Sequence, residues 1–117
     1  MVRKQTQIQD SDVRYILTRY LDRITQEFAP AEVWVWGSRV YGEPDEYSDV
    51  DMVLVSDRFE GIPFWKRRAL FRQVTGIADD PDAQVVDVLC YTRDEFREKA
   101  SSPTVVREAV QRGSRVA

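Results

Sequence analysis

Apolar residues recur at every third or fourth position between residues 13 and 28, which is the spacing of a helix that buries one face. The stripe consists of Val13, Ile16, Leu17, Tyr20, Leu21, Ile24 and Phe28. Asp10 or Ser11 stands just before it and is a candidate N-cap, because an oxygen-bearing side chain there can accept hydrogen bonds from the first free N–H groups. Pro30 is expected to end the segment. The pattern therefore predicts a core helix at the start of the chain.

Three short segments rich in valine and aromatic residues predict strands. They span residues 32–36, 49–55 and 83–91. Gly37 ends the first strand, and residues 38–41 are expected to make one helical turn before a polar loop, 43–47, that contains Pro44. Residues 56–61 form a second loop. The strands are therefore short and are separated by turn-forming residues.

Helices are predicted after the second and third strands. Pro63 suits the first turn of a helix that runs to about Ile77. Residues 92–95, Thr-Arg-Asp-Glu, have the pattern of a capping box and open a short helix. A last helix is expected to start at the Ser-Pro pair 102–103 and to stop at Gly113. Its inward-facing residues are predicted to be Val105, Val106, Ala109 and Val110.

This order of elements predicts an α/β (α+β) fold, in which a small three-stranded mixed sheet is flanked by helices. The helix between the second and third strands makes a crossover, which implies that these strands are parallel and that the connection is right-handed. The direction of the first strand relative to the second is not fixed by the pattern. Residues 1–117 contain no linker or low-complexity segment and are expected to form a single domain.

No apolar run approaches the ~20 residues needed to cross a bilayer, and the first ten residues lack the apolar core of a signal peptide. The single cysteine, Cys90, excludes an internal disulfide and is interpreted as a small core residue. These features predict a cytoplasmic protein without a membrane partner. The formal net charge of −3 gives no overall attraction to nucleic acid, so a nucleic-acid partner is not expected.

The sequence contains no histidine. This absence excludes Ser-His-Asp and Cys-His catalysis, histidine-ligated zinc and the commonest general base within the chain. Any chemistry must then depend on carboxylates, hydroxyl groups and arginines, with or without a metal ion.

Three aspartates on the second and third strands are candidate metal ligands. Asp49 and Asp51 are two residues apart in a strand, so their side chains point to the same face. If the two strands are neighbours, one register places Asp87 beside this pair. Three carboxylates so close repel one another and require a cation or a proton. Because only oxygen ligands are available, a hard ion such as Mg²⁺ is expected.

Simpler interpretations of these carboxylates stay open. An isolated Asp-x-Asp pair is most often a solvated strand end or a turn cap, and Asp87 alone could be a charge at the edge of the sheet. A calcium loop of the EF-hand type is disfavoured because the required glycine is missing. The apolar pairs 85–86 and 88–89, which flank Asp87, favour a buried strand.

Gly37, Ser38 and Arg39 follow the first strand directly. A glycine, a hydroxyl group and a helical turn at a strand end present backbone N–H groups and Ser38 Oγ to an anion. Glycine allows close approach because it has no Cβ, and Arg39 adds a permanent positive charge. The alternative is a strand-ending glycine followed by a helix-capping serine. Together with the carboxylates, the pattern indicates a site for a metal-bound nucleoside triphosphate.

Two segments, 37–42 (Gly-Ser-Arg-x-x-Gly) and 48–51 (Ser-Asp-x-Asp), together with the later Asp87, resemble the motifs of the minimal nucleotidyltransferases in the DNA polymerase beta superfamily. The resemblance covers nearly the whole chain, including the first helix and the closing segment 107–113, Arg-Glu-Ala-Val-Gln-Arg-Gly. It implies the nucleotidyltransferase fold and the transfer of a nucleoside monophosphate, AMP from ATP, to a hydroxyl group.

The resemblance implies that Gly37 and Ser38 hold the β- and γ-phosphates of ATP, with Arg39 beside them. Close relatives often carry a second basic residue shortly after the Gly-Ser-Arg motif. This chain has Val40 and Tyr41 at those positions, so Arg39 is expected to bind the phosphates without a second basic neighbour.

The resemblance also implies that Asp49 and Asp51 bind two Mg²⁺ ions. One ion would bridge the triphosphate, and the other would lower the pKa of the acceptor hydroxyl. Asp87 would join the second metal and accept the acceptor's proton, with pyrophosphate as the leaving group. The rate of such an in-line reaction is raised mostly by the positioning of the reactants and by the neutralisation of charge.

The predicted strands and helices leave few residues for binding an acceptor, so a partner protein or a second copy of the chain is expected to complete the site. By resemblance, the partner is an all-helical HEPN-type toxin that is adenylylated on a tyrosine, and this chain is its antitoxin. One alternative is a non-catalytic module that neutralises its partner by contact. Another is a transferase that acts on a small hydroxylated molecule such as an aminoglycoside.

Aromatic residues occur in two further places. Trp34 and Trp36 share one face of the first strand and are interpreted as core residues beneath a helix. Phe64 and Trp65 precede the basic run 66–68, Lys-Arg-Arg. Trp65 is expected to pack inward and the basic run to form a solvated helix face, the alternative being a contact patch for an acidic partner.

Overall fold

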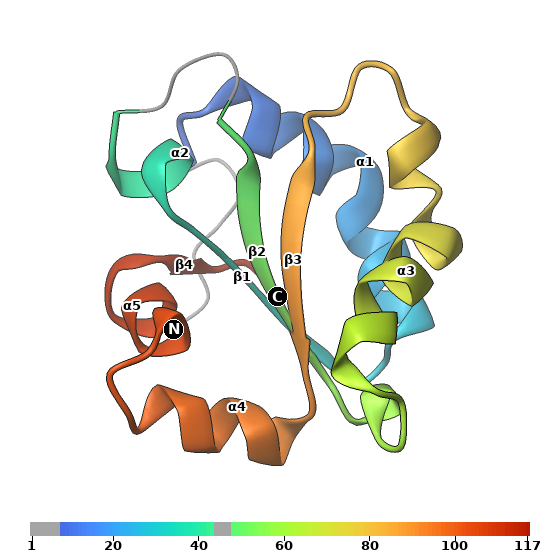
Figure 1. The fold of residues 1–117 in the computed structure, drawn as a ribbon. Coiled ribbons are helices and arrows are strands. Elements are labelled where there is room, and N and C mark those ends of the chain that lie inside the picture. The colour runs from blue at the N-terminus through green and yellow to red at the C-terminus, as the bar shows by residue number, and fades with distance from the viewer. Residues whose placement is uncertain (1–7, 44–47) are drawn as a thin grey trace.

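A computed structural model describes residues 8–43 and 48–117; most of the predicted polar loop 43–47 lies outside the described residues. Figure 1 shows a sheet with helices packed around it. The helices are α1 (Ser11–Glu27), α2 (Ser38–Tyr41), α3 (Phe64–Thr75), α4 (Arg93–Ala100) and α5 (Val105–Arg112). The strands are β1 (Ala31–Trp36), β2 (Val50–Ser56), β3 (Val86–Tyr91) and β4 (Ser114–Arg115). Short 3₁₀ helices span Asp57–Phe59 and Ile77–Asp79.

The four strands form one mixed sheet in the order β3-β2-β1-β4. β2 and β3 are parallel, as the crossover predicted, and β1 is antiparallel to both β2 and β4. The α/β class is therefore confirmed, whereas the prediction of three strands is wrong by one. β4 has only two residues, which is too short to produce an alternating pattern, and it forms only through its pairing with Trp34 and Val35.

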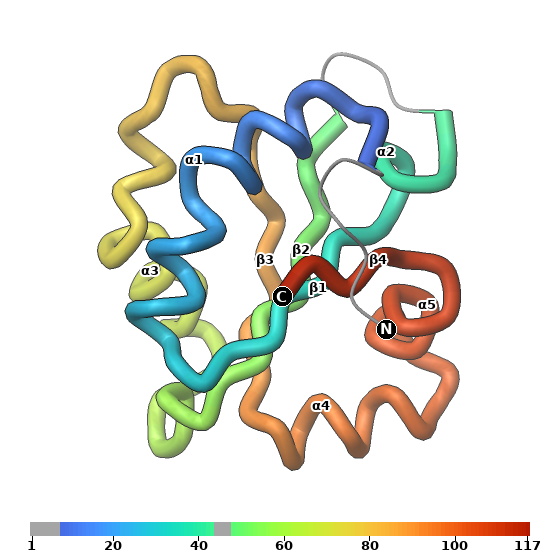
Figure 2. The backbone as a smooth tube through the Cα atoms, turned by 180° about the vertical axis from the view of Figure 1, so that it is seen from behind, coloured from blue at the N-terminus to red at the C-terminus, as the bar shows by residue number. Residues whose placement is uncertain are grey.

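Helices cover both faces of the sheet. α1 and α3 pack on one face, and Figure 2, from behind, shows α1 in front of the sheet with α3 beside it. α4 and α5 pack on the other face, over a smaller cluster of Val53, Val55, Tyr91, Val106 and Ala109. Trp34 and Trp36 are partly buried against this second cluster, which agrees with their interpretation as residues beneath a helix. None of the helices in the described ranges is long and apolar enough to cross a membrane.

Helix caps follow the sequence closely. The carboxylate of Asp10 accepts hydrogen bonds from the N–H groups of Asp12 and Val13, so Asp10 is the N-cap of α1. Thr92 and Glu95 form the predicted capping box of α4. Both are local patterns in which a side-chain oxygen satisfies a free N–H group of the first turn.

The inward face of α5 is narrower than predicted. Val106 and Ala109 are buried, as expected, whereas Val105 and Val110 are exposed. α5 packs one side against the sheet, so only residues three positions apart point toward it, and the two outer valines are directed to solvent. α5 begins after its N-cap Thr104, not at the Ser-Pro pair.

The phase of α3 also differs from the prediction. Trp65, expected to pack inward, is 76% exposed, while Arg67 in the middle of the basic run is buried. The helix buries the positions of Arg67, Phe71 and Thr75, which recur every four residues. Trp65 is two residues from Arg67 and therefore points away from the core.

The buried Arg67 joins α3 to the start of α4. Its guanidinium donates to the carbonyl oxygens of Ile62 and Cys90 and forms an ion pair with Glu95. Glu95 also accepts a hydrogen bond from the N–H of Thr92. One carboxylate thus completes the capping box and neutralises a buried arginine.

Replacing Glu95 with Gln is expected to lower the free energy of unfolding by about 1 kcal/mol at neutral pH. The hydrogen bond from Arg67 lowers the pKa of Glu95 below its ordinary value of 4.5. The charged carboxylate therefore stabilises the fold above pH 4.5, and this contribution is lost as the pH falls through the lowered pKa. Urea unfolding at several pH values measures the difference, with the exposed Glu98→Gln on the same helix as control. A stability gap that persists unchanged in strong acid would contradict this role.

Candidate active site

The parallel pairing of β2 with β3 brings two of the predicted carboxylates together. Asp51 and Asp87 are direct partners in the register of these strands. Neighbouring strands are about 4.8 Å apart, so paired residues on one face are close neighbours. Asp49 is exposed just before β2, two residues from Asp51. The three aspartates thus gather at one end of β2 and β3.

Gly37 lies against the carboxylate of Asp51. A Cβ at position 37 would stand 2.3 Å from Asp51 Oδ2, well inside van der Waals contact. Gly37 also has a φ angle of +86°, which residues with a side chain rarely adopt. A glycine is therefore required at this position for two reasons, the positive φ of the turn after β1 and the close approach of the Asp51 carboxylate. The Gly-Ser turn and the aspartate cluster are in contact at this residue.

Asp51 is a half-buried carboxylate in a negative environment. Burial, and to a smaller extent the negative charges of Asp87, Asp49 and Glu108, together raise its pKa from 3.8 to about 6. None of the described residues donates a hydrogen bond or presents a positive charge to it. Such a group is costly to ionise unless a cation compensates it.

Asp87 differs from Asp51 because it has a basic partner. Its Oδ1 accepts from Arg68 Nη2 in an ion pair. Arg68 belongs to α3, on the other side of the sheet from the carboxylates. Arg68 could not be selected from the basic run by sequence alone, because the contact joins residues 19 positions apart around a strand edge.

Ser38 opens the short helix α2 and is half-buried. No hydrogen bond of its hydroxyl group is found within the described residues. Ser38 is adjacent in sequence to Gly37, whose backbone contacts Asp51. This is the part of the Gly-Ser-Arg motif whose placement is compatible with the expected phosphate contact.

Arg39 is placed differently from the expectation. It is buried, and its guanidinium pairs with the carboxylates of Asp10 and Asp12 and donates to the carbonyl oxygen of Ser48. Its charge is compensated by the N-terminal turn of α1, which leaves little of it for a phosphate. Arg39 thereby connects Ser48, the residue before Asp49, to α1 and α2, and so it helps to position the carboxylates.

A cluster from α5 completes the surroundings of Asp51. Tyr41 Oη donates to Glu108 Oε2 at 2.6 Å, and the guanidinium of Arg112 lies 4.1 Å from the centre of the Tyr41 ring. Glu108 adds negative charge beside Asp51. Glu108 and Arg112 were not predicted as site residues from the sequence. The only feature of the sequence that pointed to them was their position in segment 107–113, which is part of the resemblance to the minimal nucleotidyltransferases.

The donor set fits a divalent cation in its chemistry. Asp49, Asp51 and Asp87 offer only oxygen ligands, which suit Mg²⁺, and Asp51 has no counter-charge within the part of the chain that the structure describes. Within residues 8–43 and 48–117, no three acidic or cysteine side chains are already arranged to hold a metal ion. The three aspartates lie at the same end of β2 and β3 but do not form such a group in this structure, in which Asp87 is paired with Arg68. Their assignment as metal ligands is taken up below as a proposal.

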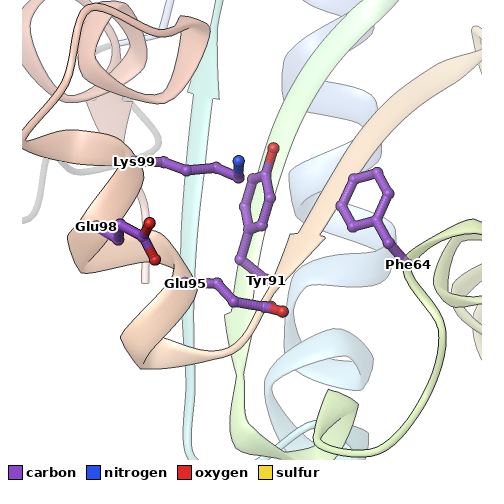
Figure 3. Close-up of a pocket in the computed structure, with 5 residues that line it drawn as sticks. All are labelled: Phe64, Tyr91, Glu95, Glu98 and Lys99. Atoms are coloured by element: carbon purple, nitrogen blue, oxygen red, sulfur yellow. The ribbon is translucent and has the colours of Figure 1, made fainter.

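A separate hollow of about 340 Å³ lies at the opposite end of β3 and is lined by Phe64, Tyr91, Glu95, Glu98 and Lys99 (Figure 3). The Tyr91 ring stands between the Phe64 ring, 5.4 Å away, and the ammonium group of Lys99. Tyr91 is four residues beyond Asp87, or about 13 Å along a strand. The hollow is therefore distinct from the carboxylate cluster.

Comparison with known proteins identifies the class. Residues 17–116 match the family model described as nucleotidyltransferase domain. The chain therefore belongs to the nucleotidyltransferase domain family, whose class of activity is the transfer of nucleotidyl groups. No curated protein matches the chain.

Comparison with solved structures gives one likeness that bears on the fold. A crystal structure described as that of a candidate nucleotidyltransferase has a TM-score of 0.53 and 21% identity, over 83% of this chain and 92% of the other. A candidate nucleotidyltransferase from Sulfolobus solfataricus has a TM-score of 0.43 and 19% identity, over 77% and 82% of the two chains. The BolA domain of SufE1 from Arabidopsis thaliana has a TM-score of 0.48 and 20% identity, over 67% and 92%. The first likeness bears on the fold alone, and the other two are too distant to bear on either fold or function.

Proposed function

We propose that this chain transfers AMP from ATP to a hydroxyl group of a partner protein in a Mg²⁺-dependent reaction. The observation that carries the proposal is the position of Asp51. This half-buried carboxylate has no counter-charge among the described residues, lies beside Asp87 and contacts the glycine of the Gly-Ser turn. A magnesium-bound triphosphate supplies the charge that this environment lacks and the phosphates that such a turn accepts.

Each residue would then have a defined task. Asp49 and Asp51 would hold Mg²⁺ together with Asp87, while Gly37 and Ser38 would contact the terminal phosphates. When bound, the metal ions would neutralise the triphosphate and lower the pKa of the acceptor hydroxyl. The acceptor oxygen forms a bond to the α-phosphorus, and the bond from that phosphorus to the bridging oxygen breaks. Pyrophosphate leaves with the electron pair, and Asp87 takes the acceptor's proton.

The acceptor in this proposal is a helical HEPN-type protein, with the chain as its antitoxin in the cytoplasm. The described helices pack on the two faces of one sheet and build no separate region for an acceptor. A partner that supplies the hydroxyl group from outside is consistent with this arrangement. It would approach the end of β2 and β3 where Asp49 and Asp87 are accessible.

Co-expression of the chain with the product of the neighbouring gene tests the proposal. Intact mass spectrometry is expected to show that the partner gains one or more nucleoside monophosphate groups, and that Asp49→Ala removes the gain. Asp87→Asn is expected to retain partner binding while losing transfer. If the partner is neutralised equally well by the wild type and by both variants, without a gain in mass, the contact-only module is the correct function instead.

A further inference from the structure

We propose that Arg68 is a positioning residue for Asp87, which it holds in the metal-free protein and releases to a divalent cation as the site assembles. This inference rests on the proposed nucleotidyl transfer and adds a control element to the same site. Arg68 competes with the cation for one carboxylate, so it sets how readily the metal binds in the absence of nucleotide.

The contact is possible because β3 is the outermost strand of the sheet. Val86 and Val88, on either side of Asp87, point into the core beneath α1 and α3. Asp87 therefore points to the opposite face, on which Leu89 and Tyr91 also lie. Arg68 starts from α3 and reaches around the free edge of β3 to meet it, which no inner strand would allow.

The Arg68–Asp87 pair is suited to exchange. Both side chains are 44% exposed, and exposed ion pairs are weak and are screened by salt. The pair can therefore open without disturbing the core. By contrast, Arg67 is buried and fixed by two carbonyl oxygens and Glu95. Arg67 thus has a structural role, which Arg68 does not share.

The effect on a metal follows from charge. While the guanidinium lies on Asp87, it occupies one carboxylate oxygen and repels any second cation placed between Asp87 and Asp51. Asp51 and Asp49 have no such partner within the described residues. Removal of Arg68 therefore leaves all three carboxylates available together. The first measurable consequence is tighter metal binding, not a change in the fold.

Titration of the nucleotide-free protein with Mn²⁺, followed by electron paramagnetic resonance of the free ion, tests the proposal. Arg68→Ala is expected to lower the Mn²⁺ dissociation constant about fivefold, and added salt is expected to reduce the difference. Arg68→Lys, which keeps the charge, is expected to stay close to the wild type. Arg72→Ala is the matched control, because it removes an exposed arginine one turn further along α3.

Equal Mn²⁺ affinity in Arg68→Ala and the wild type, with binding still abolished by Asp51→Asn, would overturn the role of Arg68 and leave the proposed function intact. An equal gain in Mn²⁺ affinity in Arg72→Ala would also overturn it, since the effect would then come from the lower net positive charge and not from the contact with Asp87. If neither the wild type nor Arg68→Ala binds Mn²⁺ through Asp51, the metal site and this inference both fail.

Discussion

Asp51→Asn is expected to reduce nucleotidyl transfer by about a thousandfold or more and, at neutral pH, to stabilise the metal-free protein by about 1 kcal/mol. The two effects have one cause. Burial and the neighbouring carboxylates raise the pKa of Asp51 from its ordinary value of 3.8 to about 6 in the fold. As the pH rises between these values, ionisation removes stability from the fold. A neutral amide avoids this cost but cannot supply the carboxylate oxygen that a metal requires.

The stability gain should depend on pH in a defined way. It is expected in full above pH 6 and should vanish below pH 3.8, where the carboxyl group of the wild type is protonated in both states. Urea unfolding in the presence of a chelator measures it, and Asp22→Asn on the exposed side of α1 is the control. If Asp51→Asn keeps transfer activity, or destabilises the metal-free protein at pH 7, this view of Asp51 is wrong.

Gly37→Ala is expected to abolish transfer and to lower the free energy of unfolding by about 2–3 kcal/mol. The new Cβ would stand 2.3 Å from Asp51 Oδ2 and would force alanine to adopt a φ of +86°. Asp51 must then move away from the turn, which separates the carboxylate from the proposed phosphate contact. Thermal or urea unfolding measures the first effect, and single-turnover transfer from labelled ATP measures the second.

A double-mutant cycle separates the two origins of this cost. Asp51→Ala removes the carboxylate that collides with the new Cβ and leaves only the backbone strain. In that background Gly37→Ala is expected to cost only about 1 kcal/mol. Equal costs in both backgrounds would show that the contact between Gly37 and Asp51 does not constrain the glycine. Gly61→Ala is a useful reference for strain alone, because Gly61 also has a positive φ but has open space around its Cβ position.

Features set by local sequence were predictable in this chain. The apolar stripe of α1, the capping box at Thr92 and the parallel pairing of β2 with β3 all depend on short-range patterns or on the length of a crossover. The pairing of Asp51 with Asp87 was predicted only as one register of these strands, because alternation between the faces of a sheet determines which side chains share a face but not how two strands are aligned. The fold class could therefore be derived, whereas the gathering of the aspartates depended on the register that the structure shows.

Features set by long-range side-chain contacts were not predictable. Arg39 binds Asp10 and Asp12, which are 27–29 positions away, and Arg68 crosses the edge of β3 to Asp87. An arginine side chain is long enough to reach several carboxylates, and sequence spacing does not determine which of them it contacts. Trp65 was misplaced for a related reason, since the buried arginine and not the tryptophan sets the phase of α3.

The central claim is that the aspartate cluster and the Gly37–Ser38 turn together hold a metal-bound triphosphate. The most direct test is a crystal structure with Mn²⁺ and a nonhydrolysable ATP analogue, in which anomalous scattering locates the metal. The account predicts anomalous density at Asp49 and Asp51, with phosphate oxygens at the backbone of Gly37 and at Ser38. Manganese or nucleotide bound elsewhere, with Asp51 facing neither, would contradict it.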